Sequence, residues 1–221
     1  MNPFSKMRTA VLISGTGSNL KALIDRQANA HYQICCVLSN RPQAKGIAFA
    51  QQAGIPTEIL DHTQFDSREA FDQAMIKALA HHQIDAIVLA GFMRILTPQF
   101  VNHYLGKMLN IHPSLLPKYP GLNTHQRALD AKDTEHGISI HFVTPELDGG
   151  PVICQSKFKI YPEDSANSLQ RKAQQHEHHT YWQVVEWLAT GDITLKNGQA
   201  WQKNHPLNAP LQLGSTLESA P

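Results

Sequence analysis

Asn110 and His112 are the residues of this sequence best suited to act together on one small substrate. They follow the apolar Met108 and Leu109 and precede Pro113, so they stand at the end of an expected strand. Side chains alternate along a strand, which places these two on the same face. An asparagine amide can donate to a developing oxyanion, and a histidine can pass a proton near neutral pH. The pair predicts chemistry of that kind, while a buried polar pair at a strand end remains the alternative.

A carboxylate that could join this pair stands in a later loop. Asp148 precedes Gly149, Gly150 and Pro151. We expect this loop to fold back toward His112, where a negative charge favours the imidazolium form. The same residues are also ordinary turn chemistry, so the sequence leaves both interpretations open.

A glycine-containing loop near the start of the chain predicts a phosphate site. Residues 14–19, with the sequence SGTGSN, separate an apolar run from Leu20, Leu23 and Ile24, which recur at helical spacing. Such a loop turns backbone N–H groups and the positive end of a helix toward an anion, and glycine allows its close approach. A turn that only connects strand and helix is the alternative.

Two familiar nucleotide loops do not fit this segment. The dinucleotide fingerprint requires a third glycine where Leu20 stands and an acidic residue after the next strand, where residues 36–40 have none. The nucleotide P-loop requires a Gly-Lys-Ser/Thr sequence, which the segment lacks. NAD and ATP are therefore disfavoured, and a phosphate monoester is the expected ligand.

Composition narrows the classes of partner. The 221 residues carry a formal net charge of +1, from 19 basic and 18 acidic residues, which favours neither nucleic acid nor an anionic membrane. The 3 cysteines do not suggest a disulfide framework, and the sequence contains neither a signal peptide nor an apolar run of membrane length. We expect a cytoplasmic protein that binds small molecules.

The elements that must position these residues alternate between strand and helix. Apolar runs predict strands at 8–13, 34–39, 57–60, 85–90, 108–111, 137–143 and 152–160. Helical spacing and cap residues predict helices starting near 20, 44, 66, 97, 125 and 165. We expect a single-domain α/β fold over residues 7–203, a Rossmann-like open and mainly parallel sheet flanked by helices, with an antiparallel C-terminal part. Residues 204–221 are expected to form a mobile tail.

Two further features suit a flat ligand at the carboxyl edge of that sheet. Residues 91–96 follow the nearly all-apolar strand at 85–90, and ligands of open α/β sheets bind at the ends of such strands. Arg68 stands in the first turn of a helix, where a cation opposes the helix dipole, so it could serve a ligand carboxylate. Core packing of Met93 and Leu96 and a solvated Arg68 are the alternatives.

The histidine cluster at 176–179 predicts no metal site. Only His176 and His179 share a helix face, and no third ligand has a motif spacing.

Four segments, 14–19, 90–96, 110–117 and 146–151, occur in one order. Together they closely resemble the phosphoribosylglycinamide formyltransferase family, folate-dependent enzymes of purine biosynthesis, over about residues 7–203. The resemblance implies transfer of a formyl group from 10-formyltetrahydrofolate to the amine of glycinamide ribonucleotide, without metal, NAD or ATP. It leaves a monomer or a weak homodimer open.

The resemblance also implies roles for individual residues. The catalytic positions are Asn110, His112 and Asp148. The ribonucleotide would be bound by Gly17, Ser18, Asn19, Gln174, Gln175, His176 and Glu177. The folate would be bound by Arg68, Met93, Arg94, Ile95, Leu96, Asn110, Thr144, Pro145, Glu146, Leu147 and Asp148.

Three rival functions share parts of this pattern. Methionyl-tRNA formyltransferases and 10-formyltetrahydrofolate hydrolases resemble it in the Asn, His and Asp set, but usually carry an additional RNA-binding or regulatory domain that we do not expect here. A non-catalytic nucleotide-binding module would use residues 14–19 and leave Asn110, His112 and Asp148 without a role.

Overall fold

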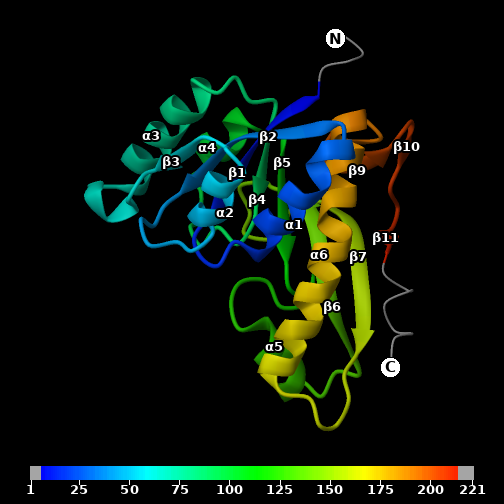
Figure 1. Ribbon diagram of the computed structural model, residues 1–221. Coiled ribbons are helices and arrows are strands. Elements are labelled where there is room, and N and C mark those ends of the chain that lie inside the picture. Colours follow the sequence, from blue (N-terminus) through cyan, green and yellow to red (C-terminus); the bar gives the residue numbers. More distant parts are fainter. Residues whose placement is uncertain (1–5, 214–221) are drawn as a thin grey trace.

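The computed structural model describes residues 6–213 and contains a large and a small sheet (Figure 1). The 8-stranded sheet has the order β11-β7-β6-β5-β4-β1-β2-β3, and the 3-stranded sheet has the order β10-β9-β8. The strands are β1 (Met7–Ile13), β2 (Tyr32–Ser39), β3 (Thr57–Ile59), β4 (Ala86–Leu89), β5 (Met108–His112), β6 (Glu135–Phe142), β7 (Val152–Lys159), β8 (Ile193–Lys196), β9 (Gln199–Gln202), β10 (His205–Pro206) and β11 (Leu211–Gln212). The α-helices are α1 (Ser18–Arg26), α2 (Ile47–Gln52), α3 (Arg68–Ala80), α4 (Pro98–His103), α5 (Thr124–Asp130) and α6 (Ala166–Thr190), with 3₁₀ turns η1 (Gln27–Asn29) and η2 (His62–Gln64).

The predicted fold class is confirmed. Strands β1 to β5 pair in parallel, while β6 runs antiparallel to both β5 and β7. The chain winds outward from β1 in both directions, so the order reverses between β1 and β4. The loops that leave β1 and β4 therefore lie side by side at the switch point, where ligands of open α/β sheets bind.

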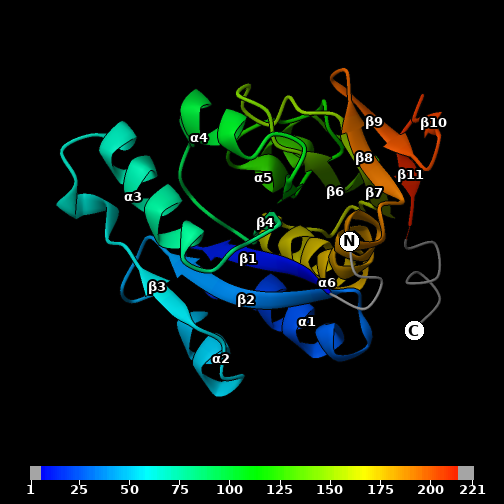
Figure 2. The same ribbon diagram turned by 90° about the horizontal axis from the view of Figure 1, so that it is seen from above.

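Helices cover the large sheet on both faces (Figure 2). On one face α1, α2 and α6 pack against β1, β2 and the C-terminal strands through a core that includes Leu20, Ile47 and Val184. On the other face α3 and α4 bury Phe71 and Phe100 against β1, β2 and β4. Both faces of the central strands are apolar, as a parallel sheet between two helical layers requires.

Local sequence signals set the helix boundaries. The Thr97 hydroxyl accepts from the Phe100 N–H, and Pro98 follows at the first helical position of α4. Ser165 and Ser168 form a reciprocal capping box at the start of α6, and Gly191 ends that helix in the left-handed conformation.

The segment expected to form a mobile tail contains regular structure. His205–Pro206 pairs with β9, and Leu211–Gln212 pairs in parallel with β7 at the edge of the large sheet. Short strands that the sequence analysis did not predict therefore lie within the segment expected to be a mobile tail. Sequence patterns missed them because two-residue strands have no readable period. Residues 214–221 lie outside the described part of the chain.

Among residues 6–213, no helix has the combination of length and apolar character that a membrane span requires.

Candidate active site

Asn110 and His112 lie at the end of β5, where the sequence placed them, and a second histidine lies beside Asn110. His141 is the cross-strand partner of Asn110 on β6. Asn110 Nδ2 is 3.1 Å from His141 Nε2, and His141 Nδ1 is 2.9 Å from the carbonyl oxygen of Phe142. Burial lowers the pKa of the His141 imidazole.

His112 and Asp148 lie close together, as the sequence predicted. Asp148 Oδ2 is 3.4 Å from His112 Nδ1 and accepts a hydrogen bond from the Gly121 N–H at 2.8 Å. His112 Nε2 donates to the carbonyl oxygen of Tyr119 at 2.9 Å. Since a carbonyl oxygen only accepts, Nε2 keeps its proton, and Nδ1 is the nitrogen that can gain or lose one.

The loop that carries Asp148 depends on glycine. A Cβ at Gly150 would lie 1.8 Å from the carbonyl oxygen of Phe142, so only glycine permits the loop to cross back over the end of β6. Asp148 itself adopts a left-handed φ of 50°, a conformation that Asp and Asn tolerate better than most residues. The sequence Asp-Gly-Gly is therefore what brings the carboxylate above His112.

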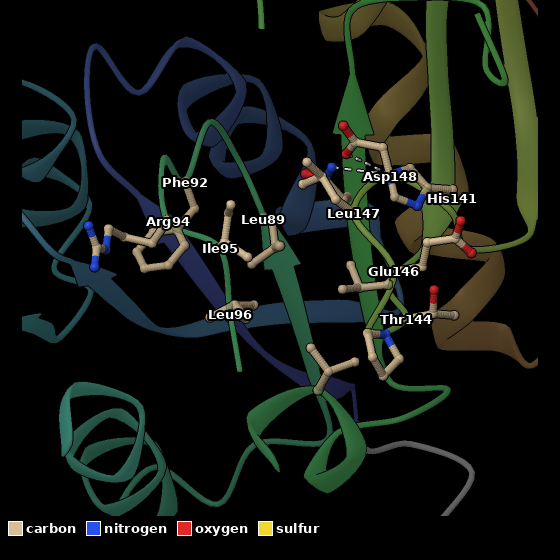
Figure 3. Close-up of a pocket in the computed structure, with 14 residues that line it drawn as sticks. Leu89, Phe92, Arg94, Ile95, Leu96, His141, Thr144, Glu146, Leu147 and Asp148 are labelled. Atoms are coloured by element: carbon tan, nitrogen blue, oxygen red, sulfur yellow. Dashed lines mark hydrogen bonds and ion pairs between the residues drawn. The ribbon is translucent and has the colours of Figure 1, made fainter. Parts of the chain in front are cut away.

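A cleft begins at Asn110 and Asp148 and runs between two loops (Figure 3). One wall is formed by the loop after β4 and the other by the loop after β6. In Figure 3, Arg94 points away from His141 and Asp148. The lining residues are Leu89, Phe92, Arg94, Ile95, Leu96, Val101, Asn110, His141, Val143, Thr144, Pro145, Glu146, Leu147 and Asp148.

Most of the residues predicted to bind the folate line this cleft, but two do not. Met93 is 59% exposed and contacts Ser14 through its backbone N–H, which donates to the serine hydroxyl at 2.7 Å. Arg68 is the first residue of α3 and lies outside the lining. The Ser14 contact joins the loop after β1 to the loop after β4.

The predicted phosphate loop lies at the start of α1, as expected. Gly17 is the N-cap, with φ 76°, and a Cβ there would lie 2.4 Å from the Cα of Gly46. The glycine is therefore required for packing between two loops. Asn19, which is the second residue of α1, donates from Nδ2 to Glu177 Oε2 at 2.8 Å.

Glu177 is a buried carboxyl group beside this loop. It is 8% exposed, and burial raises its pKa from 4.5 to about 7, while the hydrogen bond from Asn19 acts in the opposite direction. A carboxyl group with a pKa near 7 next to a helix N-terminus is typical of a functional site.

The other predicted substrate residues on α6 face different directions. Gln174 is half-buried one turn before Glu177, whereas Gln175 is exposed. His176 is buried, with Nδ1 hydrogen bonded to the Ser156 hydroxyl at 2.6 Å and its ring against Phe158. The structure thus places Gln174 and Glu177 on one face of the helix and packs His176 against β7.

His141 is the residue that sequence reasoning missed. Its signal was the alternation of Ser139 and His141 with apolar residues in β6, but the alternation does not say which strand lies opposite. Within residues 6–213, no group of three or more His, Cys, Asp or Glu side chains could hold a metal ion.

The fold and this site define a Rossmann-like formyltransferase, and the chain belongs to the formyl transferase family, whose model matches residues 7–185. Within that family the chain is similar to phosphoribosylglycinamide formyltransferases, so the resemblance predicted from the four segments is confirmed. It is 50% identical over 197 residues to the phosphoribosylglycinamide formyltransferase of Escherichia coli (strain K12), covering 88% of this chain and 93% of that protein.

Two other relatives extend this comparison. The chain is 43% identical over 202 residues to the trifunctional purine biosynthetic protein adenosine-3 of Homo sapiens, covering 90% of this chain but 20% of that longer protein. The solved structure of phosphoribosylglycinamide formyltransferase from Coxiella burnetii matches with a TM-score of 0.91 and 46% identity, covering 95% of this chain and 100% of that one.

Proposed function

We propose that this protein is an enzyme that transfers the formyl group of 10-formyltetrahydrofolate to the amine of glycinamide ribonucleotide in purine biosynthesis. The products are formylglycinamide ribonucleotide and tetrahydrofolate. The observation that supports this best is the placement of Asn110 and Asp148 in the lining of the cleft, with His112 beside Asp148 and the loop of residues 14–19 joined to the cleft wall through Ser14.

The side chains match the charges that the reaction develops. Attack of the neutral amine on the formyl carbon forms a C–N bond, with negative charge on the formyl oxygen and positive charge on the attacking nitrogen. We assign donation to that oxygen to the Asn110 amide. The attacking nitrogen must lose a proton and N10 of the folate must gain one before the C–N10 bond breaks. We assign that proton transfer to His112 Nδ1, with the Asp148 charge stabilising the imidazolium.

Both substrates find suitable surroundings. The apolar cleft suits the flat pterin ring of the folate, and the loop residues Gly17, Ser18 and Asn19 suit the phosphate of the ribonucleotide. Glu177 suits the ribose hydroxyls, because a carboxylate accepts two hydrogen bonds from a diol. The other residues assigned from the family resemblance remain proposals, as do the absence of metal, NAD and ATP, a cytoplasmic location, the lack of nucleic-acid or membrane partners and a monomeric or weakly dimeric state.

One assay tests the reaction against its alternatives. The protein is mixed with 10-formyltetrahydrofolate in the presence and absence of glycinamide ribonucleotide, and tetrahydrofolate and the formylated amine are measured. We expect equal amounts of both products, and only when the amine is present. Release of tetrahydrofolate without the amine would indicate a hydrolase instead. No turnover in either mixture would indicate a binding module, and either result would overturn the proposal.

A further inference from the structure

We propose that His141 is a positioning residue, which fixes the orientation of the Asn110 amide so that one N–H always faces the formyl oxygen. The inference rests on the function proposed above. The observation behind the inference is a chain of hydrogen bonds from the Phe142 carbonyl through His141 to Asn110.

The first step is the protonation state of the ring. His141 Nδ1 is 2.9 Å from the carbonyl oxygen of Phe142, which can only accept, so Nδ1 carries the proton. The side chain is 2% exposed, and burial disfavours the charged ring. The ring is therefore neutral, with a lone pair on Nε2.

Two charged or titratable groups near the ring do not change this assignment. Asp148 Oδ1 is 3.8 Å from His141 Nε2, which is too long for a hydrogen bond. The other carboxylate oxygen is held by the Gly121 N–H and lies 3.4 Å from His112 Nδ1. The Asp148 charge and the Phe142 carbonyl both favour a protonated His141, but burial outweighs them and lowers the pKa of the ring, and a positive charge on His112 would lower it further.

The second step is the orientation of the amide. The two ends of an asparagine amide have nearly the same shape, so packing alone does not distinguish them. His141 Nε2 can only accept, and it lies 3.1 Å from the Asn110 amide, so the NH₂ group must face the ring. One N–H is then used by His141, and the second N–H has a fixed direction.

The consequence concerns the transition state. Asn110 lines the cleft, and in the described part of the chain its side chain has one hydrogen bond, to His141. Without an acceptor at Nε2 the amide can turn over and present its oxygen to the developing oxyanion, which is repulsive. A group aimed in advance at the site of new charge is what raises kcat in such reactions.

The test uses two substitutions at one position and a matched control. His141→Leu removes the acceptor, and we expect kcat to fall roughly tenfold while KM for both substrates stays within about twofold. His141→Gln can still accept through its side-chain oxygen and should recover most of kcat. His136→Leu is the control, because His136 is equally buried on β6 but is hydrogen bonded to His125, at 2.9 Å. It should leave kcat unchanged.

A double-mutant cycle separates positioning from general support of the fold. In the Asn110→Ala background, His141→Leu should cause no further loss of kcat, because the group that it orients is gone. If His141→Leu lowers kcat as much in the Asn110→Ala background as it does in the parent, the proposal is overturned. It is also overturned if His136→Leu lowers kcat as much as His141→Leu does.

A measurement without turnover completes the test. ¹⁵N NMR of the parent protein at neutral pH should show His141 neutral and protonated at Nδ1. A proton on Nε2 would overturn the inference even if formyl transfer occurs. If the parent protein shows the Nδ1-protonated ring but transfers no formyl group, the proposed reaction is wrong, whereas the hydrogen bond between His141 and Asn110 is supported. If His141→Leu does not fold, the proposal is tested by the kcat of His141→Gln and by the His141 tautomer in the NMR spectrum.

Discussion

Replacing Glu177 by glutamine should make the protein more stable above neutral pH. The Glu177 carboxyl group is buried in α6, and its Oε2 accepts one hydrogen bond from Asn19. Burial raises its pKa from 4.5 to about 7, which means that the ionised form is held at a cost in the folded protein. Glu177→Gln keeps the shape and an acceptor for Asn19, but it removes the charge.

The size of the effect follows from the two pKa values. A difference of about 2.5 units between folded and unfolded chains corresponds to about 3 kcal/mol, at 1.36 kcal/mol per unit. Between pH 4.5 and 7 the folded state binds more protons at Glu177 than the unfolded state does, so stability falls as pH rises through this window. The full cost applies above pH 7, and it disappears below pH 4.5, where both states are protonated.

Urea unfolding of parent and variant at several pH values measures this directly. We expect Glu177→Gln to be more stable than the parent by about 3 kcal/mol near pH 8.5 and by about 1 kcal/mol near pH 5.5. Glu163→Gln, at an exposed position, is the control and should differ little from the parent. A difference between Glu177→Gln and the parent that is the same at every pH would refute the reasoning.

The same variant should bind the ribonucleotide less well. If the carboxylate accepts from the ribose hydroxyls, Glu177→Gln should raise KM for the ribonucleotide roughly tenfold and leave KM for the folate unchanged. A substitution at a functional site commonly stabilises the fold and weakens function, and Glu177→Gln is expected to do both. An unchanged ribonucleotide KM would remove Glu177 from the substrate site.

Other predictions concern the remaining parts of the site. Asn110→Ala should lower kcat on the order of a hundredfold with little change in folate binding, and a loss confined to binding would contradict its role as oxyanion donor. In Asp148→Asn, the asparagine tolerates the left-handed φ and still accepts from the Gly121 N–H, so circular dichroism should show a folded protein. Because the negative charge beside His112 is removed, kcat should fall on the order of a hundredfold. Gly17→Val should destabilise the fold by about 3 kcal/mol or more in urea unfolding, because its Cβ would meet the Gly46 backbone; a stable variant impaired only in ribonucleotide binding would contradict this. Exhaustive chelation should leave activity unchanged, and a loss restored by a stoichiometric divalent ion would show that a metal takes part.

Local signals in the sequence were sufficient for most of the elements. The cap residues Thr97 and Ser165 stand at the observed helix starts, and the central strand β4, residues 86–89, lies within the run predicted at 85–90. Such signals work because capping hydrogen bonds and side-chain periodicity involve residues within a few positions of one another. The edge strand β11 was missed because its pairing with β7 joins residues about sixty positions apart in sequence.

For the site, the sequence by itself determined which residues could do chemistry and where each loop begins. Asn110, His112, the glycine loop and the Asp-Gly-Gly turn were recognised because residue type and short spacing define them. Only the tertiary structure decided that His141 lies against Asn110, that Gly17 packs on Gly46 and that Asn19 meets Glu177 on α6. These contacts depend on strand register and on helix docking, which are set by packing across the whole sheet and leave no period in the chain.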